Sequence, residues 1–236
     1  MLNGLQSCAS AMEALSRQHE VTASNLAHMN TPGHRRMLMK FAEQLDVEDG
    51  TEARPGMTAG APTADFTAGR LMETGRKLDV AIKGDGFFAF ESQAGVMYSR
   101  SGVLFLNADT KQLENADGFP VLDSSNSPVT FDGIESGLNI GSDGTLSSNG
   151  QTLGKLGIIS FEDNKKLESV NQTLFRIGQA TAKSESDASI VQGARELSNV
   201  NPLTELIALI TGSRHFEAAQ RAMRMISDSV QENTRS

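Results

Sequence analysis

The sequence predicts an α+β protein, with one long helix near each end of the chain and an all-β middle of short antiparallel strands. Apolar residues recur at spacings of three and four in both terminal segments, which is the pattern of an amphipathic helix. The middle alternates polar and apolar residues between Gly and Asp-Gly turns, which is typical of short strands. Because neither helix can bury its apolar stripe alone, we expect the two helices to pair into a coiled-coil domain or to pack on other subunits.

The N-terminal helix is predicted from Asn3 to about His28, a segment without Pro whose single Gly lies near its start. The residues Asn30-Thr31-Pro32-Gly33 follow and end the helix, because Pro and Gly cannot continue it. Two polar residues within the stripe weaken its apolar character. The stripe consists of Leu5, Cys8, Met12, Leu15, His19, Thr22 and Leu26.

The C-terminal helix is predicted to begin at Asn201-Pro202. Asn can cap the free amides of a first turn, and Pro at the first helical position loses no hydrogen bond. Gly212 lies near the middle of this helix. Its apolar face consists of Leu206, Leu209, Phe216, Ala219, Met223, Ile226 and Val230. Together with Leu5, Cys8, Met12, Leu15 and Leu26 of the N-terminal helix, these residues form the predicted assembly seam.

The middle of the chain divides into two parts. Residues 35–77 show little periodicity and are predicted to be an extended linker or hairpin region. Residues 78–189 are predicted to be an outer β domain, a barrel or sandwich. The two terminal segments, 1–34 and 190–236, are predicted to form an inner coiled-coil domain. The expected strands of the β domain include 78–83, 87–90, 96–107, 119–122, 128–131, 138–140, 145–147, 153–161 and 173–177.

The composition argues against several classes of function. With 21 Lys and Arg against 29 Asp and Glu, the formal charge of −8 disfavours a nucleic-acid backbone as the main partner. The single cysteine, Cys8, offers neither an intrachain disulfide nor a thiolate zinc site. The absence of Trp and the single Tyr make a small-molecule pocket a weak expectation. No stretch is apolar enough for a membrane span or a cleaved signal, so we expect a cytosolic protein or one exported without a cleaved signal peptide.

The motifs that carry chemistry are weak. Gly84-Asp85-Gly86 matches a dinucleotide-binding pattern, but a strand follows where a helix would be needed, so we interpret it as a hairpin turn. The four histidines lack metal-ligand spacing, and neither a serine nucleophile elbow nor a calcium loop occurs. We therefore expect no catalytic, cofactor-binding or metal site. A β-domain binding protein or enzyme that dimerises through its helices remains the alternative.

Five stretches resemble, in the same order, sequence blocks of the flagellar rod and hook protein family: 21–33, 78–88, 98–102, 118–121 and 198–205. Any single block would be weak, and the specificity comes from their order and spacing along almost the whole chain. Two positions depart from the family pattern, which usually has Asn at His28 and an aromatic residue at His34. The motif residues are Asn25, Leu26, Ala27, Asn30, Thr31, Pro32, Gly33, Asp79, Gly84, Gly86, Phe87, Tyr98, Arg100, Gly102, Ser198, Asn199 and Val200.

The resemblance implies a structural subunit of the flagellar basal-body rod, which polymerises axially through its terminal helices. Arg214-His215-Phe216-Glu217 and the modest length favour the proximal rod type, and the distal rod type is the alternative. The implied partners are copies of the chain, other rod proteins and the flagellar type III export apparatus, with no nucleic acid, substrate or cofactor. The implied location is the periplasmic rod of the basal body, after export without a cleaved signal peptide.

Overall fold

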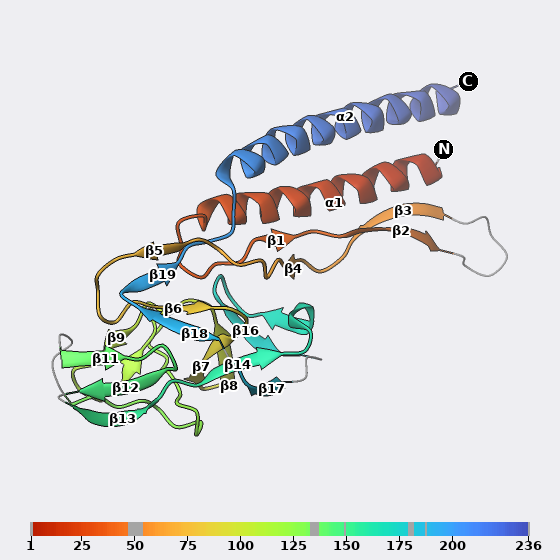
Figure 1. Ribbon diagram of the computed structural model, residues 1–236. Coiled ribbons are helices and arrows are strands. Elements are labelled where there is room, and N and C mark those ends of the chain that lie inside the picture. Colours follow the sequence, from red (N-terminus) through yellow and green to blue (C-terminus); the bar gives the residue numbers. More distant parts are fainter. Residues whose placement is uncertain are drawn as a thin grey trace. The chain divides into compact units, whose positions relative to one another are not determined.

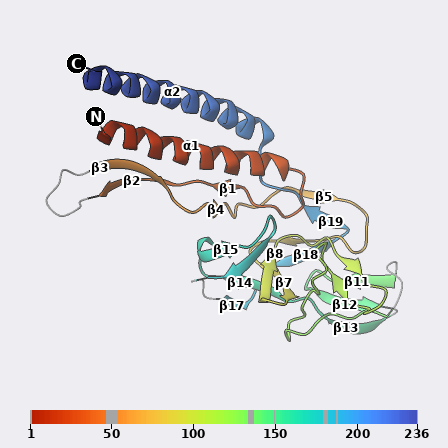
Figure 2. The same cartoon turned by 180° about the vertical axis from the view of Figure 1, so that it is seen from behind.

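The computed structural model describes residues 2–46, 54–132, 137–148, 150–178, 182–186 and 188–235. They form an α+β protein with a helix near each end and a middle of short antiparallel strands, which confirms this part of the prediction. The chain folds as two units, the first made of residues 1–29, 37–63 and 200–236 and the second of residues 30–36 and 64–199. Figures 1 and 2 show the elements of both units from opposite sides.

The first unit contains both long helices, α1 (Leu2–Ala27) and α2 (Pro202–Arg235). They lie side by side and run in opposite directions, as Figures 1 and 2 both show. A Cβ added at Gly4 would lie 3.7 Å from Cδ1 of Ile226, so the start of α1 faces the later turns of α2. The cap of α2 is formed as predicted, because Oδ1 of Asn201 accepts a hydrogen bond from the amide of Leu203 at 3.0 Å.

The same unit holds a hairpin of β2 (Phe41–Asp46) and β3 (Arg54–Ala59), which follows the short strand β1 (Met37–Leu38). Strand β3 packs on α1, so α1 lies between α2 and the hairpin. This position explains why Ala14, in the middle of α1, is only 1% exposed. By contrast, α2 packs mainly on α1.

The second unit is built from short strands, and all its ladders are antiparallel. Its largest sheet has the order β15-β16-β8-β7-β14-β17, and a smaller one has the order β11-β12-β13. Three further pairs are β18-β6, β19-β5 and β10-β9. The strands are β4 (Thr63–Ala64, at the boundary of the units), β5 (Leu71–Glu73), β6 (Val80–Lys83), β7 (Phe87–Ser92), β8 (Gly95–Ser99), β9 (Phe105–Leu106), β10 (Leu113–Glu114), β11 (Leu138–Ile140), β12 (Thr145–Ser148), β13 (Gln151–Lys155), β14 (Ile158–Phe161), β15 (Leu167–Ser169), β16 (Leu174–Ile177), β17 (Ala182–Glu185), β18 (Ser189–Gln192) and β19 (Ala194–Glu196).

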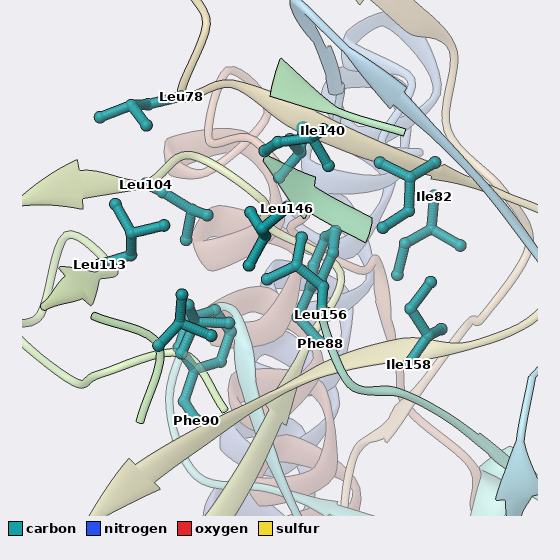
Figure 3. Packing of buried hydrophobic residues seen from close by; sticks show 14 of the residues in the cluster. Leu78, Ile82, Phe88, Phe90, Leu104, Leu113, Ile140, Leu146, Leu156 and Ile158 are labelled. Atoms are coloured by element: carbon teal, nitrogen blue, oxygen red, sulfur yellow. The ribbon is translucent and has the colours of Figure 1, made fainter. Parts of the chain in front are cut away.

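Strand β7 separates two hydrophobic clusters. Phe88 and Phe90 belong to the larger cluster, which Figure 3 shows with Leu104, Leu113, Leu146 and Leu156 around them. Phe87 and Ala89 point to the other face and join a smaller, aromatic cluster. Successive side chains of a strand face opposite sides of a sheet. The continuous apolar run Phe87–Phe90 therefore marks a strand that is buried on both faces, not a strand with one solvent-exposed face.

Several expectations about the β region were wrong. The expected strand 96–107 is divided into β8 and β9, which belong to different sheets. Gly84-Asp85-Gly86 is a turn, but not that of a hairpin, because β6 pairs with β18 while β7 pairs with β8 and β14. The expected strand 153–161 is broken between β13 and β14 at Gly157, where a Cβ would come within 2.7 Å of the Asp123 carbonyl oxygen. The expected strands 119–122 and 128–131 occur only as isolated bridges.

Candidate functional site

The outer side of α2 carries a face of exposed apolar side chains. Leu203, Ile207 and Ile210 are 67%, 57% and 54% exposed, and Leu206 beside them is 43% exposed. Their spacing of three and four residues places them on one face of the helix. Side chains of this size are usually buried, so a contiguous exposed group of them indicates a surface that another molecule covers. We call these four residues the outer face of α2.

The predicted seam residues lie at several positions in the first unit. Leu206 belongs to the outer face of α2, and the side chains of Leu5 and Val230 lie outside the described part of the chain. His19, which was expected to interrupt the stripe, is exposed. The other seam residues are partly buried: Cys8, Met12, Leu15, Leu26, Leu209, Phe216, Ala219, Met223 and Ile226.

A groove of about 370 Å³ lies between α1 and α2 near their midpoints. Leu15 and Phe216 provide its large apolar side chains, and Gly212 leaves space where other residues would carry a side chain. Ser16, His19, Ser213 and Glu217 complete its lining. No group of His, Cys, Asp and Glu that could hold a metal ion occurs among the described residues, the histidine of this groove included.

Asn25 joins three segments of the first unit. Its Nδ2 donates to the backbone oxygen of Met37 at 2.9 Å, and its Oδ1 accepts from the backbone nitrogen of Met37 at 2.8 Å. The side chain thus binds β1 as a neighbouring strand would. Nδ2 also donates to Oε2 of Glu205 in the first turn of α2, at 3.2 Å. Asn25 and Glu205 are each 1% exposed, so the motif asparagine has a structural role at the centre of this unit.

A buried ion-pair cluster occupies the second unit. Glu196 on β19 accepts from Nη2 of Arg35 at 2.7 Å and from Nε of Arg100 at 2.9 Å. The amide of Gly69 donates to the same carboxylate at 2.7 Å. Burial lowers the pKa of Arg35, while the charge of Glu196 opposes that shift. One carboxylate therefore holds together three segments that are far apart in the sequence.

Arg100 also closes the turn between β6 and β7. Its Nη1 donates to the carbonyl oxygens of Gly84 and Gly86 at 2.9 and 2.6 Å. Both glycines have positive φ angles, 118° and 149°, which residues with a side chain rarely adopt. The Gly-x-Gly motif is thus a turn that offers its carbonyl oxygens to a guanidinium group.

Asn199 ties together segments at the edge of the second unit. Its Oδ1 accepts from the amide of Arg36 at 2.7 Å, and its Nδ2 donates to the carbonyl oxygens of Asp65 and Thr67 at 2.8 and 3.1 Å. Nδ1 of His34, one of the two departures from the family pattern, lies 2.7 Å from the carbonyl oxygen of Gln172. Like Asn25, Asn199 binds backbone groups with both polar atoms of its side-chain amide, as a neighbouring strand would.

The remaining motif residues also have positions that explain them. Asp79 is buried and accepts from Nη1 of Arg76 at 3.2 Å. Gly33 has a φ of 73° and lies against the backbone of Ser101, so it tolerates no side chain. Phe87, Tyr98, Gly102 and Val200 are buried, Leu26, Thr31, Pro32 and Ser198 are partly buried, and Ala27 and Asn30 are exposed.

Sequence reasoning missed three of these buried charges, Arg35, Glu196 and Glu205. Each lies within a motif block or two residues from one. The sequence gives no clear signal of their burial, because charged residues are usually exposed and a partner cannot be inferred from one sequence.

Comparison with known proteins identifies the family of this chain. Three family models match: residues 5–35 match "Flagella basal body rod protein", residues 81–148 "Flagellar hook protein FlgE/F/G D1 domain" and residues 191–232 "Flagellar basal body rod FlgEFG protein C-terminal". The flagellar basal-body rod protein FlgF of Mesorhizobium japonicum is 32% identical over 98% of this chain and 96% of its own length. The chain belongs to the flagellar basal-body rod protein family.

Other relatives include both FlgF and FlgG proteins. FlgF of Caulobacter vibrioides is 31% identical over 94% of this chain and 93% of its own length. FlgG of Bacillus subtilis is 26% identical over 98% of both chains. The protein is therefore a structural subunit of the basal-body rod, similar to FlgF, and not an enzyme. None of its described helices is long and apolar enough to cross a membrane.

Proposed function

We propose that this rod subunit polymerises axially through its terminal helices, which pair as a coiled coil. The observation that carries the proposal is the outer face of α2, where four large apolar side chains are exposed on one side of a helix whose other side packs on α1. Burying each Leu or Ile contributes roughly 1.5 to 3 kcal/mol. An assembly that covers this face in every subunit gains that energy at each contact.

The partners in this proposal are copies of the chain and other rod proteins as axial neighbours. A contact between two different surfaces does not close on itself, so it generates an open helical stack. Such a stack transmits torque through many contacts at once, which suits a drive shaft. Membership of the rod family supports this choice over a dimer joined through its helices.

The location of the protein and the roles of its segments are also proposals. We infer a place in the periplasmic rod, at its proximal part, after export by the flagellar type III apparatus without a cleaved signal peptide. The support is the similarity to FlgF proteins. In this proposal residues 1–34 and 190–236 form the inner assembly domain, residues 35–77 bridge, and residues 78–189 form an outer β domain.

A charge on the outer face tests the assembly proposal. Ile207→Asp places a carboxylate on this face, and burying an unpaired charge at a subunit contact costs several kcal/mol. In a strain that lacks its own copy, we expect the variant to be absent from isolated basal bodies and the cells to lose motility. The melting temperature of the purified protein should not change, because Ile207 is 57% exposed within the chain.

The control is Gln220→Asp, which places the same charge on an exposed polar position of α2. It should leave incorporation and motility intact. Full motility of the Ile207→Asp strain would refute the proposal. A lower melting temperature of that variant would instead show that Ile207 supports the fold of the subunit itself.

A further inference from the structure

The relative register of α1 and α2 is fixed at two distant points. Asn25 lies opposite Glu205, and Gly4 lies opposite Ile226. The two points are 21 residues apart on each helix, from 4 to 25 and from 205 to 226. Equal separations on both helices mean that the register does not change between the two points.

Apolar packing alone gives little preference for this register. Partly buried apolar residues of α2 recur every seven residues, at Leu209, Phe216 and Met223, and Phe216 lines the groove beside α1. A shift of one helix by seven residues, about 10.5 Å along the axis, would therefore keep these apolar positions of α2 on the side of α1, although the stripe of α1 also contains His19 and Thr22. Some other feature must distinguish the observed register from the shifted ones.

The polar pair at the end of the helices supplies that distinction. Asn25 is anchored independently, because both polar groups of its side chain bind the backbone of Met37. These two hydrogen bonds do not involve α2. In the observed register Nδ2 of Asn25 meets the buried carboxylate of Glu205, whereas a seven-residue shift would place Gly212 opposite Asn25 and remove Glu205 from this donor.

We propose that Glu205 is a positioning residue that sets the register of α2 on α1 through the anchored amide of Asn25. A buried polar group at a largely apolar helix seam specifies register at a cost in stability. The register in turn sets where the outer face of α2 lies along the helix pair. That last consequence rests on the proposed assembly, but the register itself does not.

Cysteine pairs in the purified full-length protein can report the register, in a background with Cys8→Ser. A disulfide needs Cα atoms within about 7 Å, so it separates registers that differ by about 10.5 Å. The pair G4C and I226C reports the observed register, and the pair G4C and N233C reports the seven-residue shift that places Gly212 opposite Asn25. With Glu205 present, we expect oxidation to join only the first pair.

Glu205→Leu should allow both pairs to form while the melting temperature stays the same or rises, because an apolar residue replaces a buried charge. Glu205→Gln is the matched control, since its side-chain oxygen still accepts from Asn25, and it should join only the first pair.

The proposal is overturned if Glu205→Leu joins only the first pair. It is also overturned if Glu205→Leu lowers the melting temperature and joins neither pair, because Glu205 would then act only in stability. Failure of the assembly test with Ile207→Asp would leave these outcomes unaffected.

Discussion

Nε of Arg100 lies 2.9 Å from Oε2 of Glu196, although 96 positions separate the two residues in the sequence. Their side chains are 5% and 1% exposed, and the other oxygen of the carboxylate binds Arg35. A carboxylate in this position does more than offset charge, because it joins β19 to the residue that follows β8 and to the segment that follows the first helix. The stability of the second unit should therefore depend on it strongly.

We expect Glu196→Ala to lower the free energy of unfolding by about 3 to 5 kcal/mol, because it leaves two buried guanidinium groups without their carboxylate. Denaturant unfolding of the purified protein measures this. The matched control is Glu168→Ala, which breaks an ion pair with Arg176 of the same 2.7 Å length as that of Arg35 but with both side chains more than half exposed. It should cost less than about 1 kcal/mol. Equal effects of the two changes would contradict the role assigned to the buried cluster.

Gly102 is expected to tolerate no side chain. A Cβ there would overlap the carbonyl oxygen of Val80 and lie 2.7 Å from Cε2 of Phe88 in the core. Gly102→Ala should cost about 1 to 3 kcal/mol or more, because the neighbouring backbone must move. Gly154→Ala is the control, since nothing lies within 4 Å of the added carbon. Thermal unfolding of both variants compares them, and an unchanged melting temperature for Gly102→Ala would show that the backbone around Gly102 adapts.

Much of the fold could be predicted from the sequence where one physical signal dominates. Asn201 and Pro202 define the start of α2 because capping and the missing amide of Pro act locally. The N-terminal helix, expected from Asn3 to about His28, was likewise found at Leu2–Ala27. Local signals of this kind need no knowledge of the rest of the chain.

Pairing between distant segments could not be predicted in the same way. The turn at Gly84 and Gly86 was recognised, but the partner of β6 is β18, which lies about a hundred residues later in the chain. Similarly, Asn25 was singled out as a motif residue, while its partners Met37 and Glu205 were not. A single sequence shows which residues are unusual for their setting, but it does not show which partner satisfies them.

The single tyrosine gives a prediction about pH. Burial raises the pKa of Tyr98 above its ordinary value of 10, because the phenolate loses solvation in the aromatic cluster. The folded state holds this proton more tightly than the unfolded state does. The contribution to stability is therefore complete below the unfolded pKa near 10, and it is lost as the pH rises through the higher folded value.

Ultraviolet absorbance of tyrosinate follows this group without interference, because the chain has one Tyr and no Trp. The folded protein should titrate at a higher pH than the same protein in denaturant, and its melting temperature should begin to fall above about pH 10. Identical titration curves in the two conditions would mean that Tyr98 is solvated in the folded protein.

The last prediction concerns where the β region ends. A fragment of residues 78–189 lacks Ile190, which is 3% exposed and lies opposite Ile82 in the ladder between β18 and β6. It also lacks Glu196, so Arg100 would be buried without its carboxylate. We expect a fragment of residues 64–199, which retains both residues, to be more stable by several kcal/mol, from apolar burial and the retained ion pair together.

Denaturant unfolding of the two purified fragments measures the difference. The longer fragment with Glu196→Ala serves as the control, since it keeps Ile190 and loses only the carboxylate, and its stability should fall between those of the other two. If residues 78–189 unfold at the same denaturant concentration as residues 64–199, then β18 and β19 contribute nothing to the β domain, and the division expected from the sequence is the better description.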